Sequence, residues 1–417
     1  MTINAIPGGI CAAKGFSAAG MHAGIRRNTS KNDLALLLSS KAAATAAVYT
    51  RNAVKGAPIA VTSRHIAASA GYTRAVICNS GNANTCNPGG EETAEITCTA
   101  LASELAIKPE EVVVASTGVI GAPLDPKPIL AAIPQLANQI APTTGAAHEA
   151  AKAILTTDTH AKEIAVSFDL PAASGTGTVT CHIGGMAKGS GMIHPDMATM
   201  LVFITSDVAI SPTLLQYALS TDVQSTFNMT SVDGDTSTND MAIILANGLG
   251  GNAPITSEND PSFALFMEAL NTVTMALCKM IAGDGEGATK LLECCVTGAA
   301  DTASARTLAK SVICSSLVKT AMFGADANWG RVLCALGYSG APFDPLGVSV
   351  AFTSPAGSIQ MCEKGVAIGF SEDRAKEILS EREITIEVTL SDADASATAW
   401  GCDLSYDYVK INGDYRT

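Results

Sequence analysis

Short apolar runs, each ended by small polar residues, recur along the first half of the chain and constrain its fold more than any other feature. They are rich in branched residues and carry almost no charge, a pattern that predicts buried strands. Segments with helical spacing lie between them, so this half predicts a layered α/β body. The predicted strands are 33–39, 57–62, 74–78, 111–116, 164–168, 176–182 and 200–205, and the predicted helices are 91–105, 126–139 and 145–155.

The second half has a different pattern. Helices are predicted over 212–227, 261–281 and 301–318. From residue 347 short alternating strands surround one further helix, which is typical of a small α+β domain. Alternation over 404–411 predicts a last strand that fixes the terminus. We therefore expect a main α/β domain over 1–285, a smaller α+β domain over 286–400 and a tail over 401–417.

Composition argues against several classes of function. The chain has 417 residues, 47% of them hydrophobic, and a net charge of −13, whereas a nucleic-acid partner requires a basic surface. Its 12 cysteines form no CxxC pair, which argues against zinc and for reduced thiols in the cytoplasm. The Asp-rich segment 231–240 lacks EF-hand spacing, no glycine-rich nucleotide motif is present, and no apolar run reaches a membrane span. We expect no metal, cofactor, membrane or nucleic acid.

The segment 187–207 changes character at Thr199, where a loop gives way to an apolar strand. If the chain were cut between Ala198 and Thr199, the threonine would become a new N-terminus. Its α-amino group, with a pKa of about 7.7–8, could then take the hydroxyl proton and make the side chain a nucleophile. The same hydroxyl could make the cut by attacking the Ala198 carbonyl, which gives an ester that water opens. From these residues alone, a simple strand start is the more economical interpretation.

Other loops rich in small polar residues follow predicted strands or helices. Thr117 and Gly118 follow the strand 111–116, where the loop could supply oxyanion donors or be an ordinary turn. Glu286 lies among glycines after the helix 261–281, either as a positioned charge or within a helix-ending turn. The loop 79–84 could present backbone amides to a ligand or simply be a turn.

Several of these segments together carry a resemblance. The run 188–201 (KGSGMIHPDMATML) resembles the self-cleavage segment of the ornithine acetyltransferase family of arginine biosynthesis. The resemblance extends, in the family's order, to 79–84 (NSGNAN), 115–121 (ASTGVIG), 156–159 (TTDT), 283–290 (GDGEGATK), 325–331 (ADANWGR) and 411–417 (INGDYRT). It therefore covers the chain from end to end.

The resemblance implies an αββα-type sandwich, as in self-cleaving N-terminal-nucleophile-like acyltransferases, and an α2β2 assembly of chains 1–198 and 199–417. It implies that Thr199 takes the acetyl group of N-acetylornithine and passes it to glutamate. The implied oxyanion donors are Thr117 and Gly118, and the implied substrate-binding residues are one of Thr156 and Thr157, together with Lys188, Thr199, Glu286, Asn412 and Thr417.

The alternative functions differ in the acetyl donor, in the acceptor of the acyl group or in whether the chain is cut. Use of acetyl-CoA to acetylate glutamate would make the enzyme bifunctional, and no sequence feature decides this. A self-processing amidohydrolase or aminopeptidase would pass the acyl group to water instead of glutamate. An assembly protein without enzymatic activity would remain a single uncut chain.

Overall fold

The computed structural model describes residues 2–194 and 200–414, so the predictions for Ala198, Thr199 and Thr417 concern residues outside the described part. Within that part the chain forms two compact units. Unit 1 comprises 2–189, 200–224 and 236–277, and unit 2 comprises 190–194, 225–235 and 278–414. Both contain a sheet with helices, which confirms the predicted mixed α/β class.

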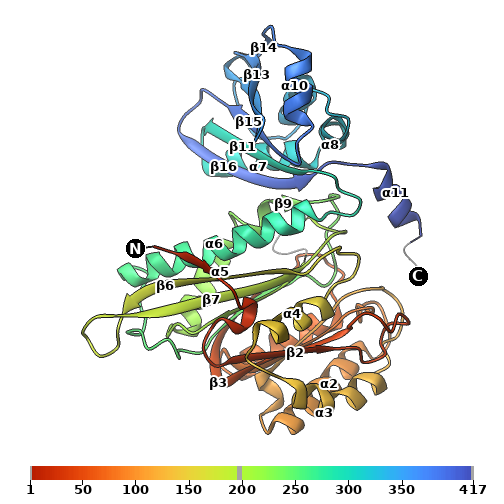
Figure 1. The fold of residues 1–417 in the computed structure, drawn as a ribbon, viewed down its shortest axis with the longest axis vertical. Coiled ribbons are helices and arrows are strands. Elements are labelled where there is room, and N and C mark those ends of the chain that lie inside the picture. Colours follow the sequence, from red (N-terminus) through yellow and green to blue (C-terminus); the bar gives the residue numbers. More distant parts are fainter. Residues whose placement is uncertain (1, 195–199, 415–417) are drawn as a thin grey trace. The chain divides into compact units, whose positions relative to one another are not determined.

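Unit 1 is built on a nine-stranded sheet. Its strands follow the order β1-β6-β7-β8-β10-β3-β4-β5, and β2 also pairs with β3. Figure 1 shows β6 and β7 as a long antiparallel pair. The strands are β1 (Asn4–Ile6), β2 (Phe16–Met21), β3 (Leu34–Tyr49), β4 (Tyr72–Asn79), β5 (Val112–Ser116), β6 (Lys162–Pro171), β7 (Thr178–Lys188), β8 (Leu201–Ser206) and β10 (Met241–Ala246).

The long strand β3 joins two halves of this sheet around one core. Its first part pairs with β2, and its second part pairs with β10. Strand β4 pairs with both parts, across a register shift between Leu38 and Ala43. Buried residues from both halves, such as Val76 of β4 and Phe203 of β8, belong to one apolar cluster. The predicted strands were recognisable because burial on both faces leaves almost no polar positions.

Helices pack against this sheet. The outer face of β3, β4 and β5 forms a second apolar cluster with α2 and α3, which lie side by side in Figure 1. The helices are α1 (Ala57–Ala68), α2 (Gly90–Leu105), α3 (Lys127–Gln139), α4 (Thr144–Ala153), α5 (Pro212–Asp222) and α6 (Pro261–Gly283), with 3-10 turns at Gly9–Cys11 and Pro109–Glu111.

One predicted strand of unit 1 is wrong, because 57–62 is the start of helix α1. Extended Gly56 precedes the helix, and Pro58 lies in its first turn, where a missing N–H costs nothing. Pro58, Ile59, Val61, Thr62 and His65 are buried at helical spacing. The apolar run was too short for its period to separate the two structures.

Helix α6 is long and apolar enough to cross a membrane by length and composition, contrary to the expectation from run lengths. Its apolar positions nevertheless recur at helical spacing, and Phe266, Leu270, Val273 and Leu277 are fully buried within the protein. Such burial is typical of a core helix.

Unit 2 contains a seven-stranded sheet in the order β14-β13-β12-β15-β11-β16-β9. Helix α7 packs on β11 and β16, and α10 packs on β12 and β13. The strands are β9 (Thr230–Ser231), β11 (Leu291–Ala299), β12 (Ser349–Ser354), β13 (Gly357–Glu363), β14 (Val366–Ala367), β15 (Glu383–Thr389) and β16 (Ala395–Cys402). The helices are α7 (Thr302–Cys314), α8 (Ser316–Phe323), α9 (Trp329–Gly337), α10 (Glu372–Leu379) and α11 (Tyr406–Gly413), with 3-10 turns at Phe227–Met229 and Pro345–Gly347.

Two predictions for unit 2 are corrected. The helix predicted over 301–318 is broken at Ser315, whose hydroxyl accepts from Val318 N and begins a new helix, α8. The strand predicted over 404–411 is helix α11 instead, and Ser405 caps it by accepting from Asp407 N. Alternating aromatic residues over so short a segment do not exclude helical spacing, and a capping serine decides the outcome.

Candidate active site

The loop after β5 is held in a conformation that only glycine can take at its second position. Gly118 has a φ of +131°, and a Cβ there would lie 2.4 Å from the carbonyl carbon of Gly81. Ser116 Oγ donates to Asn79 Oδ1 at 2.6 Å, and Thr117 N donates to Asn79 O at 3.0 Å. The loops after the parallel strands β4 and β5 are therefore joined into one rigid element.

These contacts show which donors the loop retains. The backbone N–H of Thr117 is already used, whereas no described residue accepts from Gly118 N. The side-chain oxygen of Thr117 accepts from Lys188 Nζ at 3.4 Å, so its own hydrogen is left to donate elsewhere. The loop can thus offer the Thr117 hydroxyl and the Gly118 N–H to a developing negative charge.

Lys188 brings a buried positive charge to this loop. It is the last residue of β7 and is 8% exposed. It pairs directly with Leu201 of β8, two residues beyond Thr199 in the chain. Met200 O accepts from Met241 N at 2.8 Å, which fixes the backbone immediately after Thr199.

Asp158 connects Lys188 with the polar turn that follows α4. Its Oδ1 accepts from Lys162 Nζ and from Gly189 N, both at 2.7 Å, and its Oδ2 accepts from Thr156 N at 3.0 Å. Burial alone would raise the pKa of Asp158, but the charges of Lys162 and Lys188 and these hydrogen bonds hold it below its usual range. The carboxylate therefore stays ionised and fixes both segments.

Two neighbouring residues of unit 1 complete this group. Asn239 donates to Ala83 O at 2.6 Å and to Ser116 O at 2.9 Å, which braces the loop after β5 from behind. Asp240 is 2% exposed, and among the described residues its Oδ2 has no hydrogen-bond partner. Burial raises the pKa of Asp240 well above its usual value, which favours the neutral carboxyl.

In unit 2, Glu286 lies on the glycine-rich turn after α6. It is 6% exposed, and its Oε2 accepts from Asn412 Nδ2 of α11 at 2.7 Å. A Cβ at Gly191 would lie 2.4 Å from the Glu286 carboxyl carbon, so the glycine provides the space that this carboxylate fills. A buried carboxylate with one amide partner is suited to receive a cation.

A second acidic residue of unit 2 orders the same region. Asp233 accepts from Met192 N at 2.6 Å and from Ile193 N at 2.9 Å, and Tyr408 OH donates to it at 3.3 Å. Burial and the charges of Asp233 and Glu286 raise the pKa of Tyr408 above its usual range, so the phenol stays protonated. Asp233 thereby links the segment 192–193 to helix α11, a structural use of the Asp-rich stretch.

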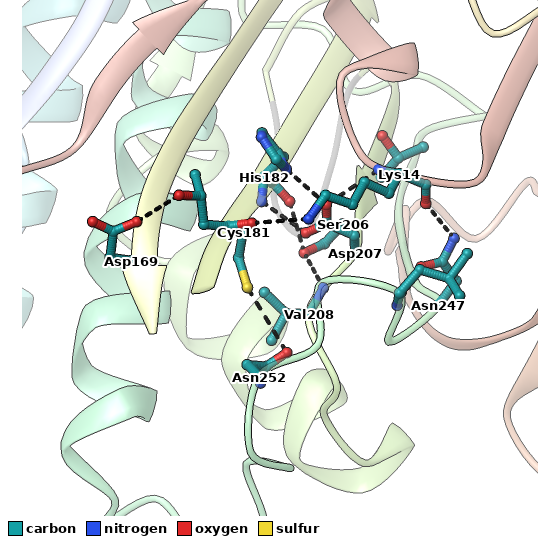
Figure 2. Close-up of polar contacts among 12 residues, drawn as sticks. Lys14, Asp169, Cys181, His182, Ser206, Asp207, Val208, Asn247 and Asn252 are labelled. Carbon is teal, nitrogen blue, oxygen red and sulfur yellow. Dashed lines mark hydrogen bonds and ion pairs between the residues drawn. The ribbon is translucent and has the colours of Figure 1, made fainter. Parts of the chain in front are cut away.

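The other end of the β7–β8 pair carries a separate polar cluster (Figure 2). Asp207 is fully buried and accepts from His182 N at 2.7 Å and from Lys14 N at 3.1 Å. His182 Nδ1 lies 2.7 Å from Asp207 Oδ2, and Asn247 Nδ2 donates to Lys14 O at 2.8 Å. Each carboxylate oxygen of Asp207 thus has a partner within the cluster.

The predicted site residues fall into two groups. Unit 1 brings Thr117, Gly118, Lys188 and Thr156 together, the last through Asp158, while Thr157 makes no side-chain hydrogen bond to the described residues. Unit 2 brings Glu286 and Asn412 together. Sequence reasoning did not single out Asp158, Lys162, Asp233 or Asn239. A lysine at the head of an otherwise apolar strand, four residues after an aspartate, was the available signal for the first two.

Hydroxyl and amide donors beside a buried ammonium, at the ends of strands in an α/β body, are groups of the kind that an acyl-transfer enzyme uses. Residues 17–417 match the model of the ArgJ family. The chain is 49% identical to the arginine biosynthesis bifunctional protein ArgJ 1 of Clostridium acetobutylicum, over 96% of each chain, and 49% identical to ArgJ of Symbiobacterium thermophilum, over 99% of each. A solved chain of Bacillus halodurans ArgJ is 47% identical, covering 51% of this chain and 97% of its own length, with a TM-score of 0.49.

The chain belongs to the ArgJ family, and the resemblance found in its loops is confirmed. It is a transferase of arginine biosynthesis.

Proposed function

We propose that the enzyme transfers the acetyl group of N2-acetyl-L-ornithine to L-glutamate, through an acetyl ester on Thr199. The observation that supports this most is the Thr117 hydroxyl, whose oxygen accepts from Lys188 so that its hydrogen is available to an oxyanion. A hydroxyl in this position has a clear use in acyl transfer, and the family relationship supplies the substrates.

The nucleophile has to form before the first turnover. Thr199 Oγ attacks the carbonyl carbon of Ala198, the peptide nitrogen leaves as the new α-amine, and water hydrolyses the resulting ester. The products are chains 1–198 and 199–417, which we expect to remain together as an α2β2 assembly in the cytoplasm.

Acetyl transfer then has two balanced half-reactions. The neutral α-amine of Thr199 removes the hydroxyl proton, Oγ attacks the acetyl carbonyl, and the oxyanion accepts hydrogen bonds from Thr117 and Gly118. Collapse breaks the amide bond, and the α-ammonium returns the proton to the departing amine of ornithine. The amine of glutamate next attacks the acetyl ester, which restores the Thr199 hydroxyl and releases N-acetylglutamate.

The remaining predicted residues would bind the amino-acid parts of the substrates. Lys188 would pair with the α-carboxylate that both substrates share, with help from Thr156 or Thr157. Glu286 would receive an ammonium group, and Asn412 and Thr417 would also bind the amino-acid substrate. Acetyl-CoA would be a second acetyl donor, as the word bifunctional in the relatives' names suggests.

Initial-rate kinetics test this proposal. With both substrates varied, double-reciprocal plots should be parallel, because the first product leaves before glutamate binds. Intersecting lines would contradict an acetyl-enzyme. Release of acetate without glutamate, at a rate equal to transfer, would indicate an amidohydrolase instead. A parallel assay with acetyl-CoA as donor decides whether the enzyme has the second activity.

Denaturing electrophoresis of the active protein tests the self-cleavage. Two fragments that divide the 42.5 kDa chain near residue 198 are expected, and Thr199→Ala should give one uncut and inactive chain. An intact chain in fully active protein would overturn the proposed nucleophile.

A further inference from the structure

Lys188 is a buried ammonium that forms no ion pair with a carboxylate among the described residues. Lys162 and Asp158 have side chains that are 0% exposed, and their charged atoms are 2.7 Å apart. Lys188 is 8% exposed, and its charge also acts on Asp158, which binds the backbone of the next residue, Gly189. Two buried ammonium groups thus share one carboxylate.

Asp158 does not act as the direct counter-ion of Lys188. Its two oxygens accept from Lys162 Nζ, Gly189 N and Thr156 N. The only side-chain hydrogen bond that Lys188 makes to the described residues goes to the neutral hydroxyl of Thr117. The ammonium is therefore held near a carboxylate whose hydrogen-bonding positions are already filled.

Two further titratable groups on which the charge of Lys188 acts do not supply a negative charge either. Burial raises the pKa of Asp240 well above its usual value and raises the pKa of the Cys78 thiol to about 12, so both favour their neutral forms. Lys188 therefore has no ionised side chain hydrogen-bonded to it among the described residues. A buried ammonium without its own counter-ion is costly, unless a ligand provides the anion.

We propose that Lys162 is a positioning residue that, by pairing with Asp158, keeps Lys188 available for the carboxylate of the substrate. Lys162 pairs with the carboxylate of Asp158, and Asp158 fixes the backbone at Gly189, next to Lys188. The ammonium group of Lys188 therefore remains open to an anionic ligand. This inference rests on the proposed acetyl transfer and adds the reason why the site selects donors that carry a carboxylate.

The arrangement makes an unusual prediction for combined substitutions. In Lys162→Met, Asp158 keeps its bonds to Gly189 N and Thr156 N but loses its ammonium partner. Its charge should then pair with Lys188 instead, which would cancel the charge that receives the substrate. Adding Asp158→Asn to Lys162→Met removes that competing carboxylate and should return Lys188 to the ligand. The double variant should therefore bind carboxylate-bearing donors better than the single one.

The experiment compares two acetyl donors with glutamate as acceptor. One is N2-acetyl-L-ornithine, and the other is N-acetyl-1,4-diaminobutane, which has the same amide and the distal amine but no carboxylate. The readout is the ratio of kcat/KM for the two donors on one preparation, so the fraction of folded or cleaved enzyme cancels. Lys152→Met is the matched control, because Lys152 forms an exposed ion pair with Glu149 at 2.9 Å.

The expected loss of the ratio in Lys162→Met is about tenfold or more, the usual worth of a charge-assisted hydrogen bond. Lys162→Met with Asp158→Asn should recover most of that loss, and Lys152→Met should match the unmodified enzyme. An unchanged ratio in Lys162→Met, or a ratio in the double variant as low as in the single one, would overturn the proposal.

The proposal can still be tested if one of the variants does not fold. If Lys162→Met gives no soluble protein, the double variant decides, since it removes both members of the buried pair and should keep the preference for the carboxylate donor within about threefold. Loss of that preference in the double variant would overturn the inference. Failure of the proposed function is distinct, because the unmodified enzyme would then transfer no acetyl group from either donor.

Discussion

The two ends of the β7–β8 pair carry polar clusters of similar composition and different completeness. At one end, Asp207 accepts from His182 and Lys14, and each of its oxygens has a partner (Figure 2). At the other end, Lys188 lies against the Thr117 hydroxyl, and Asp240 retains an oxygen without a partner among the described residues. Both clusters are buried, so the difference does not come from solvent.

Buried polar groups in proteins are normally satisfied, and the exceptions call for an explanation. The Asp207 cluster follows the rule and joins His182 of β7 to the residue that follows β8. The Lys188 cluster departs from it, as expected where a ligand completes the hydrogen bonds. In these two clusters, the completeness of the hydrogen bonds differs more than the residue types do.

Thr117→Val, at the Lys188 cluster, should have the largest effect of the substitutions that compare the two clusters. The substitution keeps the shape of the side chain and removes one oxyanion donor, which costs about 2.7–4 kcal/mol of the activation barrier. Steady-state kinetics should show kcat lower by about 10²–10³-fold, with little change in melting temperature. Thr117→Ser, which keeps the hydroxyl, is the control, and equal losses in both variants would mean that the hydroxyl is not the donor.

Asp207→Asn should lower the stability of the protein and leave kcat nearly unchanged, which is the reverse of the effect expected for Thr117→Val. The amide nitrogen cannot accept from His182 or Lys14, and losing such charge-assisted bonds costs about 1.5–3 kcal/mol of the free energy of unfolding. Thermal denaturation should therefore shift down, while kcat stays within about twofold because the cluster lies at the other end of the strands. A normal melting temperature with a large loss of kcat would reverse the assignment of the two clusters.

Gly191→Ala tests whether Glu286 of unit 2 binds the substrate. The added Cβ would lie 2.4 Å from the Glu286 carboxyl carbon and displace that carboxylate. We expect KM for N2-acetyl-L-ornithine to rise by about tenfold or more, since small misplacements of a binding group are costly. Gly145→Ala is the matched control, because no atom lies within 4 Å of the position that its Cβ would take. Equal KM values in the two variants would argue against a role for Glu286 in binding.

Asp240→Asn should have the smallest effect of these substitutions, and unlike Asp207→Asn it should not lower the free energy of unfolding. The pKa of Asp240 is raised in the folded protein, so ionisation opposes folding as pH rises above the unfolded value of about 3.9. The amide has no such penalty, and stability at pH 7 should be unchanged or higher by up to about 1 kcal/mol. Urea denaturation at pH 4 and pH 7 measures this, and a variant that is less stable only at pH 7 would contradict it.

The strands of unit 1 could be predicted because runs such as 111–116 and 200–205 are apolar on both faces. The segment 57–62 could not, because its run is short and its helix depends on Gly56 and Pro58 at the start. The loop motifs of Thr117, Lys188 and Glu286 were visible because each lies in a run of small polar residues. The sequence could not show which of Asp158 and Asp207 belongs to the candidate site. The register of β6, β7 and β8 determines what surrounds each carboxylate.

The acetyl-enzyme itself provides the most direct test of the account. The protein is mixed with N2-acetyl-L-ornithine without glutamate, denatured with acid within the first turnovers, and subjected to mass spectrometry of its fragments. We predict that the fragment 199–417 carries one acetyl group, that fragmentation places it on Thr199, and that adding glutamate before the acid removes it. A full-length chain in active protein, or an acetyl group on any other residue, would contradict the account.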